Sequence, residues 1–349
     1  MNHTPTPTSE TTLKTITALT ASGLVTPEDA AGLAPVAARY ATAVTPAMAK
    51  LASDPRIARQ FVPDVRELVT LPEERADPIG DAAHSPVKGI VHRYPDRVLL
   101  MPTLACAVYC RFCFRRETVG GAGGLTAGEL TAALDYIRTT PAIWEVILTG
   151  GDPLVLAPRK IEEIIASLDA TPHVRTIRIH SRVPVAAPER IDGALIGALR
   201  ATGKAVYVGV HCNTAAELTP EAVAACARLV DAGIPLLAQT VLLKGVNDTV
   251  EDLDALFRAL VAARIKPYYL HQLDYAPGTS HFRVPLAQGQ ALVGALRGRL
   301  SGIAHPTYIL DIPGGAGKVP AASASPEGDG TYIVRDPQGT AHSYPPSPL

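Results

Sequence analysis

The sequence predicts an α/β protein whose parallel sheet is either open or curved into an incomplete barrel. From Arg97 onward, short apolar runs alternate with longer amphipathic stretches, and roughly six such repeats are typical of β-α units around one sheet. Residues 11 to about 60 are alanine-rich with helical spacing, and Pro27-Glu28-Asp29 is a plausible helix start. We therefore expect a helical cap before the sheet.

The expected elements follow from the apolar pattern along the chain. Six buried strands are predicted at 98–101, 145–148, 175–179, 205–210, 236–241 and 268–271. The helices between and after them are predicted at 127–138, 160–168, 191–201, 220–232, 250–263 and 286–300. Near the C-terminus, 331–334 and 340–344 are expected to pair as a hairpin.

The charge balance favours a small substrate. Lys and Arg number 32 against 33 Asp and Glu, for a net charge of -1, so electrostatics gives no reason to expect nucleic acid or an anionic membrane as partner. The sequence shows neither a secretory signal nor an apolar stretch of membrane-spanning length. A cytoplasmic location is therefore expected, and the five cysteines, three of them crowded together, suit a reduced compartment.

The crowded cysteines predict a metal site. Cys106-Ala-Val-Tyr-Cys110-Arg-Phe-Cys113 directly follows the first predicted strand. Three thiolates can hold three irons of a [4Fe–4S] cluster and leave the fourth iron open to a ligand. Zinc is the alternative, but it would need a fourth Cys or His at its usual spacing, which the neighbouring positions do not supply. Cys212 and Cys226 are expected to be small core residues.

Two glycine-rich segments are also candidates for ligand contacts, because ligands gather at the carboxyl ends of parallel strands. Thr149-Gly150-Gly151-Asp152-Pro153 follows the second strand, where glycine lets the backbone approach a ligand closely. Asp311-Ile-Pro-Gly-Gly-Ala-Gly-Lys318 is no phosphate-binding P-loop, because Ile312 and Val319 occupy positions that require Gly and Ser/Thr. A lysine on such a loop can instead approach a carbonyl and form a Schiff base, although a solvated loop lysine is the simpler alternative.

These motifs resemble a known family. The C-x3-C-x2-C spacing resembles the signature of the radical S-adenosylmethionine (SAM) superfamily. The runs His92-Arg-Tyr-Pro-Asp-Arg97 and Asp311 to Lys318 resemble lysine 2,3-aminomutase, and the similarity covers roughly residues 70 to 345. The resemblance implies an incomplete parallel (β/α)6 barrel of radical SAM type, in which residues 93–311 are the core. A disordered tail at 1–10 and a cap at 11–92 would precede it, and a short extension at 312–349 would carry the lysine that binds pyridoxal 5'-phosphate (PLP).

The resemblance also implies three groups of binding residues. Those for the cluster and SAM would be Cys106, Cys110, Cys113, Phe112, Gly150, Gly151 and Asp152. Those for PLP would be Lys318, the phosphate-binding Arg93 and Arg97, and Gln239. Those for the substrate would be Arg115 at the carboxylate and the pair Asp274 and Asp311 at the terminal ammonium. Bidentate guanidinium contacts suit a phosphate dianion, and two carboxylates can offset the desolvation of one buried cation.

The implied activity is the migration of an amino group between adjacent carbons of L-lysine to give β-lysine, started by a radical made from SAM. A flavodoxin or ferredoxin would supply the electron, and an oligomer is compatible with the family. Thr249 stands where longer clostridial-type enzymes carry a zinc-binding cysteine, and the chain ends at Leu349 without their C-terminal cysteine cluster, so no structural zinc is expected. Arg178-Ile-His-Ser-Arg182 and Tyr269-Leu-His271 resemble the short branch that makes β-lysine for elongation factor P.

Two alternatives stay open at this point. One is the same chemistry on another basic amino acid, such as arginine or ornithine. The other is a non-catalytic iron–sulfur protein, which would leave the Lys318 segment and the phosphate-type arginines without a purpose.

Overall fold

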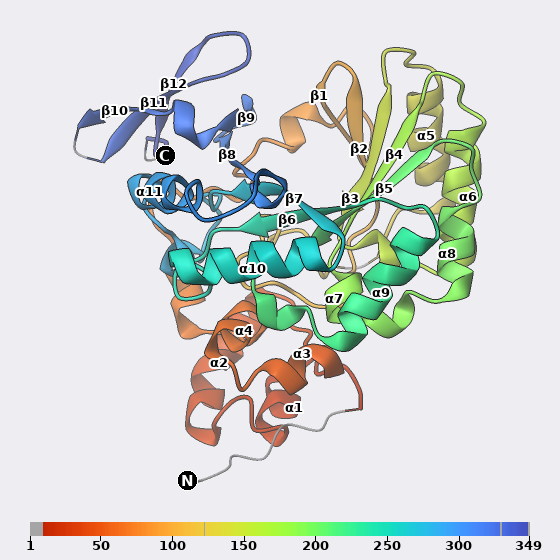
Figure 1. Ribbon diagram of the computed structural model, residues 1–349. Coiled ribbons are helices and arrows are strands. Elements are labelled where there is room, and N and C mark those ends of the chain that lie inside the picture. Colours follow the sequence, from red (N-terminus) through yellow and green to blue (C-terminus); the bar gives the residue numbers. More distant parts are fainter. Residues whose placement is uncertain (1–9, 122, 329, 348–349) are drawn as a thin grey trace.

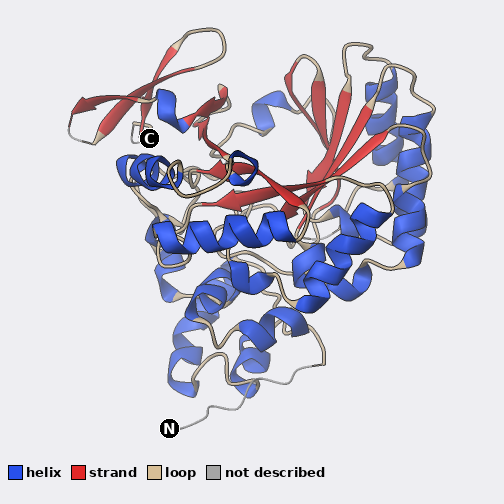
Figure 2. Ribbon diagram, in the orientation of Figure 1, coloured by secondary structure: helices blue, strands red, loops and turns tan. Residues whose placement is uncertain are grey.

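The computed structural model describes residues 10–121, 123–328 and 330–347. Residues 1–9, nearly all of the expected disordered tail, lie outside this description. A nine-stranded sheet forms the centre, with N-terminal helices at one end and a separate three-stranded sheet near the C-terminus (Figure 1). Figure 2 shows the helices covering the outer face of the curved sheet. Among the described residues, no helix has the length and apolar character needed to cross a bilayer.

The strands of the large sheet lie side by side in chain order. Strands β1 to β9 are Ile90–Tyr94, Arg97–Thr103, Glu145–Gly150, Thr176–Ser181, Ala205–His211, Leu236–Val241, Ile265–His271, Thr307–Ile312 and Gly317–Pro320. Strands β2 to β8 pair in parallel, whereas β1 and β9 pair antiparallel at the two edges. This arrangement confirms the expected incomplete barrel of six β-α units.

The helices complete the β-α units and the N-terminal region. The N-terminal helices α1 to α4 are Ile16–Ala21, Pro27–Arg39, Pro46–Leu51 and Pro55–Phe61. Helices α5 to α11 are Ala127–Arg138, Pro158–Asp169, Val183–Ala186, Gly193–Leu199, Pro220–Asp231, Val250–Ala262 and Leu286–Leu296. The small sheet contains β10, β11 and β12 at Ser325–Gly328, Thr331–Arg335 and Ala341–Tyr344. The pairing of β11 with β12 confirms the predicted terminal hairpin.

Local signals explain where the helices begin. Thr26 caps α2 just before Pro27, and Thr126 forms a capping box with Glu129 at the start of α5. Helix α8 begins two residues later than predicted because the side chain of Asp192 accepts from Leu195 N and caps it. Thr249 caps α10 in the same way, with its hydroxyl accepting from Asp252 N at 3.1 Å. Thr249 thus has a structural function as a helix cap.

Four strands were absent from the predicted elements, and Lys318 lies on one of them. Strands β1, β8, β9 and β10 were not expected, and β9 has little strand propensity because it begins with Gly317. It forms by pairing with β8, so that Asp311 lies opposite Lys318. The prediction of a lysine on a glycine-rich loop is therefore wrong in one respect. Glycines 314 and 315, both at positive φ, make the turn, and Lys318 lies just beyond it on an edge strand.

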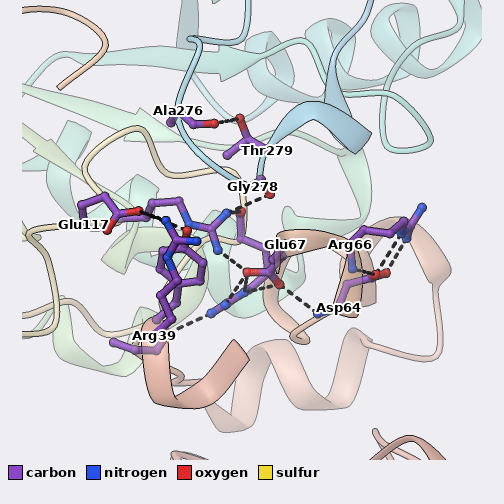
Figure 3. A network of polar contacts seen from close by, with 12 residues as sticks. Arg39, Asp64, Arg66, Glu67, Glu117, Ala276, Gly278 and Thr279 are labelled. Atoms are coloured by element: carbon purple, nitrogen blue, oxygen red, sulfur yellow. Dashed lines mark hydrogen bonds and ion pairs between the residues drawn. The ribbon is translucent and has the colours of Figure 1, made fainter. Parts of the chain in front are cut away.

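A buried carboxylate fixes the cysteine segment to the N-terminal region (Figure 3). Glu67 lies on a 3-10 turn, Val65–Leu68, and its side chain is fully buried. It accepts hydrogen bonds from Arg111 at 2.6 to 3.1 Å and forms an ion pair with Arg116. These two arginines lie on either side of Cys113, and Arg116 Nη1 also donates to Arg111 O at 2.9 Å. The path of the chain through the cysteines thus depends on one acidic residue outside the barrel.

We predict that Glu67→Gln destabilises the protein strongly. The change would leave two guanidinium groups, only 2% and 3% exposed, without their counter-ion, and breaking such buried pairs costs roughly 3 kcal/mol or more. Glu251→Gln is the matched control, because Glu251 pairs with Arg299 at the surface and such pairs contribute at most about 1 kcal/mol. Urea unfolding of both variants measures the difference, and equal midpoints would show that the clamp is not needed.

Candidate active site

The three clustered cysteines follow β2 at the carboxyl end of the parallel strands. Their side chains are partly exposed and free of disulfides, and they are close enough to interact electrostatically. Burial and the neighbouring Cys110 raise the pKa of the Cys113 thiol to about 11. No three His, Cys, Asp or Glu side chains of the described residues surround one point as ligands of a single metal ion. A [4Fe–4S] cluster instead takes its thiolates on three different irons, and three neighbouring thiols fit that donor set.

A second buried network holds the cysteine segment from the barrel side. Arg182, which follows β4, donates from Nη1 to Cys110 Sγ at 3.4 Å and pairs with the fully buried Glu217. Its Nη2 also donates to the side-chain oxygen of Gln60 at 2.6 Å, and Arg111 N donates to Gln60 O at 2.8 Å. A cation thus lies directly beside one of the candidate cluster ligands.

The Gly-Gly-Asp segment after β3 packs under the cysteine segment. A Cβ on Gly151 would lie 2.3 Å from Ala105 O, and one on Gly150 would lie 2.9 Å from Thr103 O. Asp152 is buried and accepts hydrogen bonds from the hydroxyl of Ser181 at 2.7 Å and from Arg182 N at 2.7 Å. Steric contact between two pieces of backbone therefore explains both glycines. Their predicted contact with SAM stays a prediction.

Phe112 belongs to the cysteine segment and directly precedes Cys113. Its ring is 7% exposed and packs edge to face on Phe282, with 6.0 Å between centroids. Leu243, Val246 and Leu273 complete this small apolar cluster. The predicted role of Phe112 beside adenine also stays a prediction.

Several of the predicted PLP and substrate residues meet where the two edge strands approach each other. We call this contact between β1 and β9, together with residues 77–85, the seam. Lys318 Nζ forms an ion pair with Asp311, and Lys318 N donates to the hydroxyl of Tyr94 at 2.7 Å. Arg93 Nη1 lies 3.5 Å from the other oxygen of Asp311, and Arg93 also donates to Ile79 O. Side chains and not backbone ladders therefore close the barrel here.

The two predicted substrate aspartates have opposite electrostatic environments. Burial and the adjacent charge of Asp311 raise the pKa of Asp274 to about 8. Burial also works against ionisation of Asp311, but Lys318, His271 and Arg93 outweigh it and hold the pKa of Asp311 below its usual value. Within the described residues, the carboxylate of Asp274 has no hydrogen-bond or ion-pair partner, whereas that of Asp311 has two cations. Asp311 is therefore ionised and compensated by cations, whereas Asp274 is protonated near neutral pH. A cation bound beside Asp274 would favour its ionised form.

The predicted arginines do not all lie together. Arg115 lies at the seam, paired with Asp81 at 2.7 Å. Arg97 does not, because its guanidinium pairs with Asp96 at 2.7 Å and stacks over the Tyr94 ring at 3.8 Å. Its expected neighbour Arg93 turns instead toward Asp311. The structure thus brings Arg93, Arg115, Asp274, Asp311 and Lys318 into one charged group and leaves Arg97 beside it.

Three histidines and Gln239 line the barrel next to the seam. His180, His211 and His271 end or nearly end β4, β5 and β7. Burial lowers the pKa of His211 to about 4 and that of His271 to about 3, and it places that of His180 well below its usual value. All three are therefore neutral at pH 7. The side-chain nitrogen of Gln239 lies 2.9 Å from His180 Nε2, which places the predicted glutamine inside the barrel.

Sequence reasoning missed several residues of this site. No role was assigned to Asp81, Tyr94, His211 or Glu67. The histidines of β4 and β7 were noted only because their segments resemble the short branch of the family. One signal was available for the histidines, since each lies at the carboxyl end of a predicted strand, where ligands gather. Asp81 and Glu67 carry no such signal, because long-range pairing alone brings them to the site.

Comparisons with known proteins agree with this arrangement. Residues 100–260 match the model of the radical SAM superfamily. The chain is 41% identical over 294 residues to the L-lysine 2,3-aminomutase of Fusobacterium nucleatum, covering 82% of this chain and 68% of that protein. It is 39% identical over 328 residues to the enzyme of the same name from Acetoanaerobium sticklandii, covering 92% and 79%. A glutamate 2,3-aminomutase from Clostridioides difficile is 38% identical over 249 residues, covering 71% and 59%.

The fold, the position of the cysteine segment and this similarity over most of the chain lead to one assignment. The chain belongs to the lysine 2,3-aminomutase family of radical SAM enzymes.

Proposed function

We propose that the protein moves the α-amino group of L-lysine to the neighbouring carbon and so forms β-lysine. One observation carries this proposal. A lysine ammonium, that of Lys318, already lies on Asp311, and the carboxylate of the half-buried neighbour Asp274 has no hydrogen-bond or ion-pair partner among the described residues. Two carboxylates placed in this way suit the distal ammonium of a basic amino acid.

Membership of the radical SAM superfamily implies a [4Fe–4S] cluster and SAM. We propose Cys106, Cys110 and Cys113 as the cluster ligands, with Phe112 and residues 150–152 beside SAM. The position of the thiols after β2 and their mutual proximity support this assignment. Arg182, at 3.4 Å from Cys110 Sγ, would place a positive charge beside the cluster.

The seam residues fit PLP. Lys318 is reached from the site, with a side chain 35% exposed, and can carry the cofactor covalently. Arg93 Nε is buried without a hydrogen-bond partner among the described residues, so it retains a donor for the cofactor phosphate. Arg97 would have to leave Asp96 to contribute a second guanidinium. We propose Gln239 as a further contact from β6.

When bound, the cluster and SAM supply a radical that removes hydrogen from the substrate, and PLP carries the amino group as it migrates. The protein's own task is to bind, orient and exclude water. Asp311 pairs with the protonated Nζ of Lys318 as long as no cofactor is bound to that lysine. The neutral histidines add no charge that would compete for Asp311. Arg115, two residues beyond Cys113, would hold the α-carboxylate next to the cluster.

The charges favour lysine over glutamate. A second carboxylate at the far end of the substrate would meet Asp274 and Asp311, which repel it, whereas an ammonium would pair with both. The similarity to a glutamate 2,3-aminomutase makes this comparison necessary. Ornithine and arginine also carry a distal cation, but with a different reach, so they are the stricter competitors.

The cellular setting is proposed from the sequence motifs. The segments Arg178 to Arg182 and Tyr269 to His271 resemble the short branch that supplies β-lysine for elongation factor P. We propose the same use here, in the cytoplasm, with a flavodoxin or ferredoxin as electron donor. The free thiols near the active site suit a reducing compartment.

Product analysis after anaerobic incubation with lysine, ornithine, arginine and glutamate tests the proposed function. We expect β-lysine as the main product, and Asp274→Asn and Asp311→Asn should each lose at least roughly a hundredfold in turnover, as expected when a buried charge loses its partner. Asp231→Asn, at an exposed pair with Arg264, should retain full activity. Equal conversion of glutamate and lysine, or normal activity in both site variants, would disprove the substrate assignment.

The raised pKa of Asp274 predicts a pH-dependent cost of folding. With a pKa of about 8 when folded and near 4 when unfolded, this carboxyl binds a proton more tightly in the folded state. The stabilisation of the folded state that this proton binding provides therefore falls as pH rises from 4 to 8, and it is fully lost above that range. Ligand-free Asp274→Asn should gain in melting temperature over the wild type as pH rises from 5 to 9. A difference that stays constant with pH would show that Asp274 ionises normally.

A further inference from the structure

One carboxylate at the seam is shared by two arginines. Asp81 Oδ2 accepts a hydrogen bond from Arg115 Nε at 2.8 Å and forms an ion pair with Arg115 Nη2 at 2.7 Å. Its Oδ1 lies 3.3 Å from Nη2 of Arg93. The three side chains are only 10% to 15% exposed. Asp81 therefore joins the residue that follows the cysteine segment to the edge strand β1.

The geometry leaves half of the Arg115 guanidinium available. A guanidinium has two edges that can each bind a carboxylate, one formed by Nε and Nη2 and one by both Nη atoms. Asp81 occupies the first edge with a single oxygen. Arg115 Nη1 has no hydrogen-bond partner among the described residues, and the guanidinium is close enough to interact electrostatically with Asp274 and His211. The Arg115 guanidinium thus belongs to the same charged group as the paired aspartates.

Asp81 is itself held rigidly. The carboxylate of Asp77 accepts from Asp81 N at 2.9 Å and from Ala82 N at 2.8 Å. Gly80, at φ +67°, packs so closely that a Cβ there would lie 2.5 Å from Gly314 O, and Gly314 N donates to Pro78 O at 3.0 Å. The segment is therefore wedged against the turn that precedes Lys318. The backbone at Asp81 is thus held by contacts that do not involve Arg115.

We propose that Asp81 is a positioning residue that orients Arg115 toward the α-carboxylate of the substrate. This inference rests on the proposed function and deepens it. It makes Asp81, acting through Arg115, responsible for the preference of the site for an α-amino acid over a simple diamine. A rigid anion on one edge of the guanidinium fixes the direction of the other edge before substrate arrives, which lowers the entropy lost on binding. Asp81 does not compete with the substrate, since each carboxylate takes a different edge.

Binding of L-lysine and of cadaverine to anaerobic holoenzyme tests the proposal. Cadaverine has the same amines as lysine but lacks the carboxylate, so only lysine should sense the orientation of Arg115. We expect Asp81→Asn to weaken lysine binding on the order of tenfold, the scale of one charge-assisted contact, and to leave cadaverine binding unchanged. Asp81→Glu should restore part of the loss, and Asp231→Asn should change neither affinity. Titration calorimetry measures both ligands.

Other results would overturn the proposal in recognisable ways. Equal loss of both ligands would show a general structural defect, and tighter lysine binding would show that Asp81 competes with substrate. A double-mutant cycle separates this coupling from a folding defect. Asp81→Asn should cause no further loss of lysine affinity in a variant whose Arg115 guanidinium has already been removed by Arg115→Lys. Additive losses in that cycle would disprove the coupling. Failure of the wild type itself to bind lysine would instead overturn the proposed function and this inference with it.

Discussion

The open sheet imposes the constraint on which the rest of this structure depends. In the part of the chain that the structure describes, strands β1 and β9 pair with a neighbour on one side only, and an exposed edge must be covered or blocked. Here the two edges meet through Arg93, Asp311, Lys318 and the hydroxyl of Tyr94. Charges in such a buried place are stable only when paired. The closure of the barrel and the collection of charges for amino-acid chemistry are therefore one arrangement.

The cysteine segment is fixed independently of this seam. Glu67 and Gln60 hold it from the N-terminal region, and Arg182 holds it from the barrel. Asp81 then connects the two parts, since Arg115 belongs to the cysteine segment and Arg93 to β1. A short path of buried ion pairs thus runs from the candidate cluster site to the candidate PLP site. This rigidity suits a reaction whose partners must be held in contact while solvent is excluded.

Sequence reasoning predicted the parts that depend on local pattern. Apolar runs located β2 to β7, and the spacing of Cys106, Cys110 and Cys113 singled out the candidate cluster site, because both signals lie within a few residues. It failed where no local pattern marks the partner that a residue takes in the folded chain. Strand β9 has little strand propensity of its own and forms by pairing with β8, which puts Lys318 opposite Asp311. Likewise, Arg97 turns to its neighbour Asp96, and Asp81 becomes important only through two arginines supplied by other segments.

The central claim is that amino-group chemistry takes place at the seam, and covalent labelling tests it most directly. Anaerobically purified protein would be saturated with PLP, reduced with borohydride and digested for peptide mass spectrometry. The structure predicts a pyridoxyl group on Lys318, the lysine whose Nζ lies on Asp311. Labelling of Lys244 or of the exposed Lys88, with Lys318 unmodified, would contradict the account.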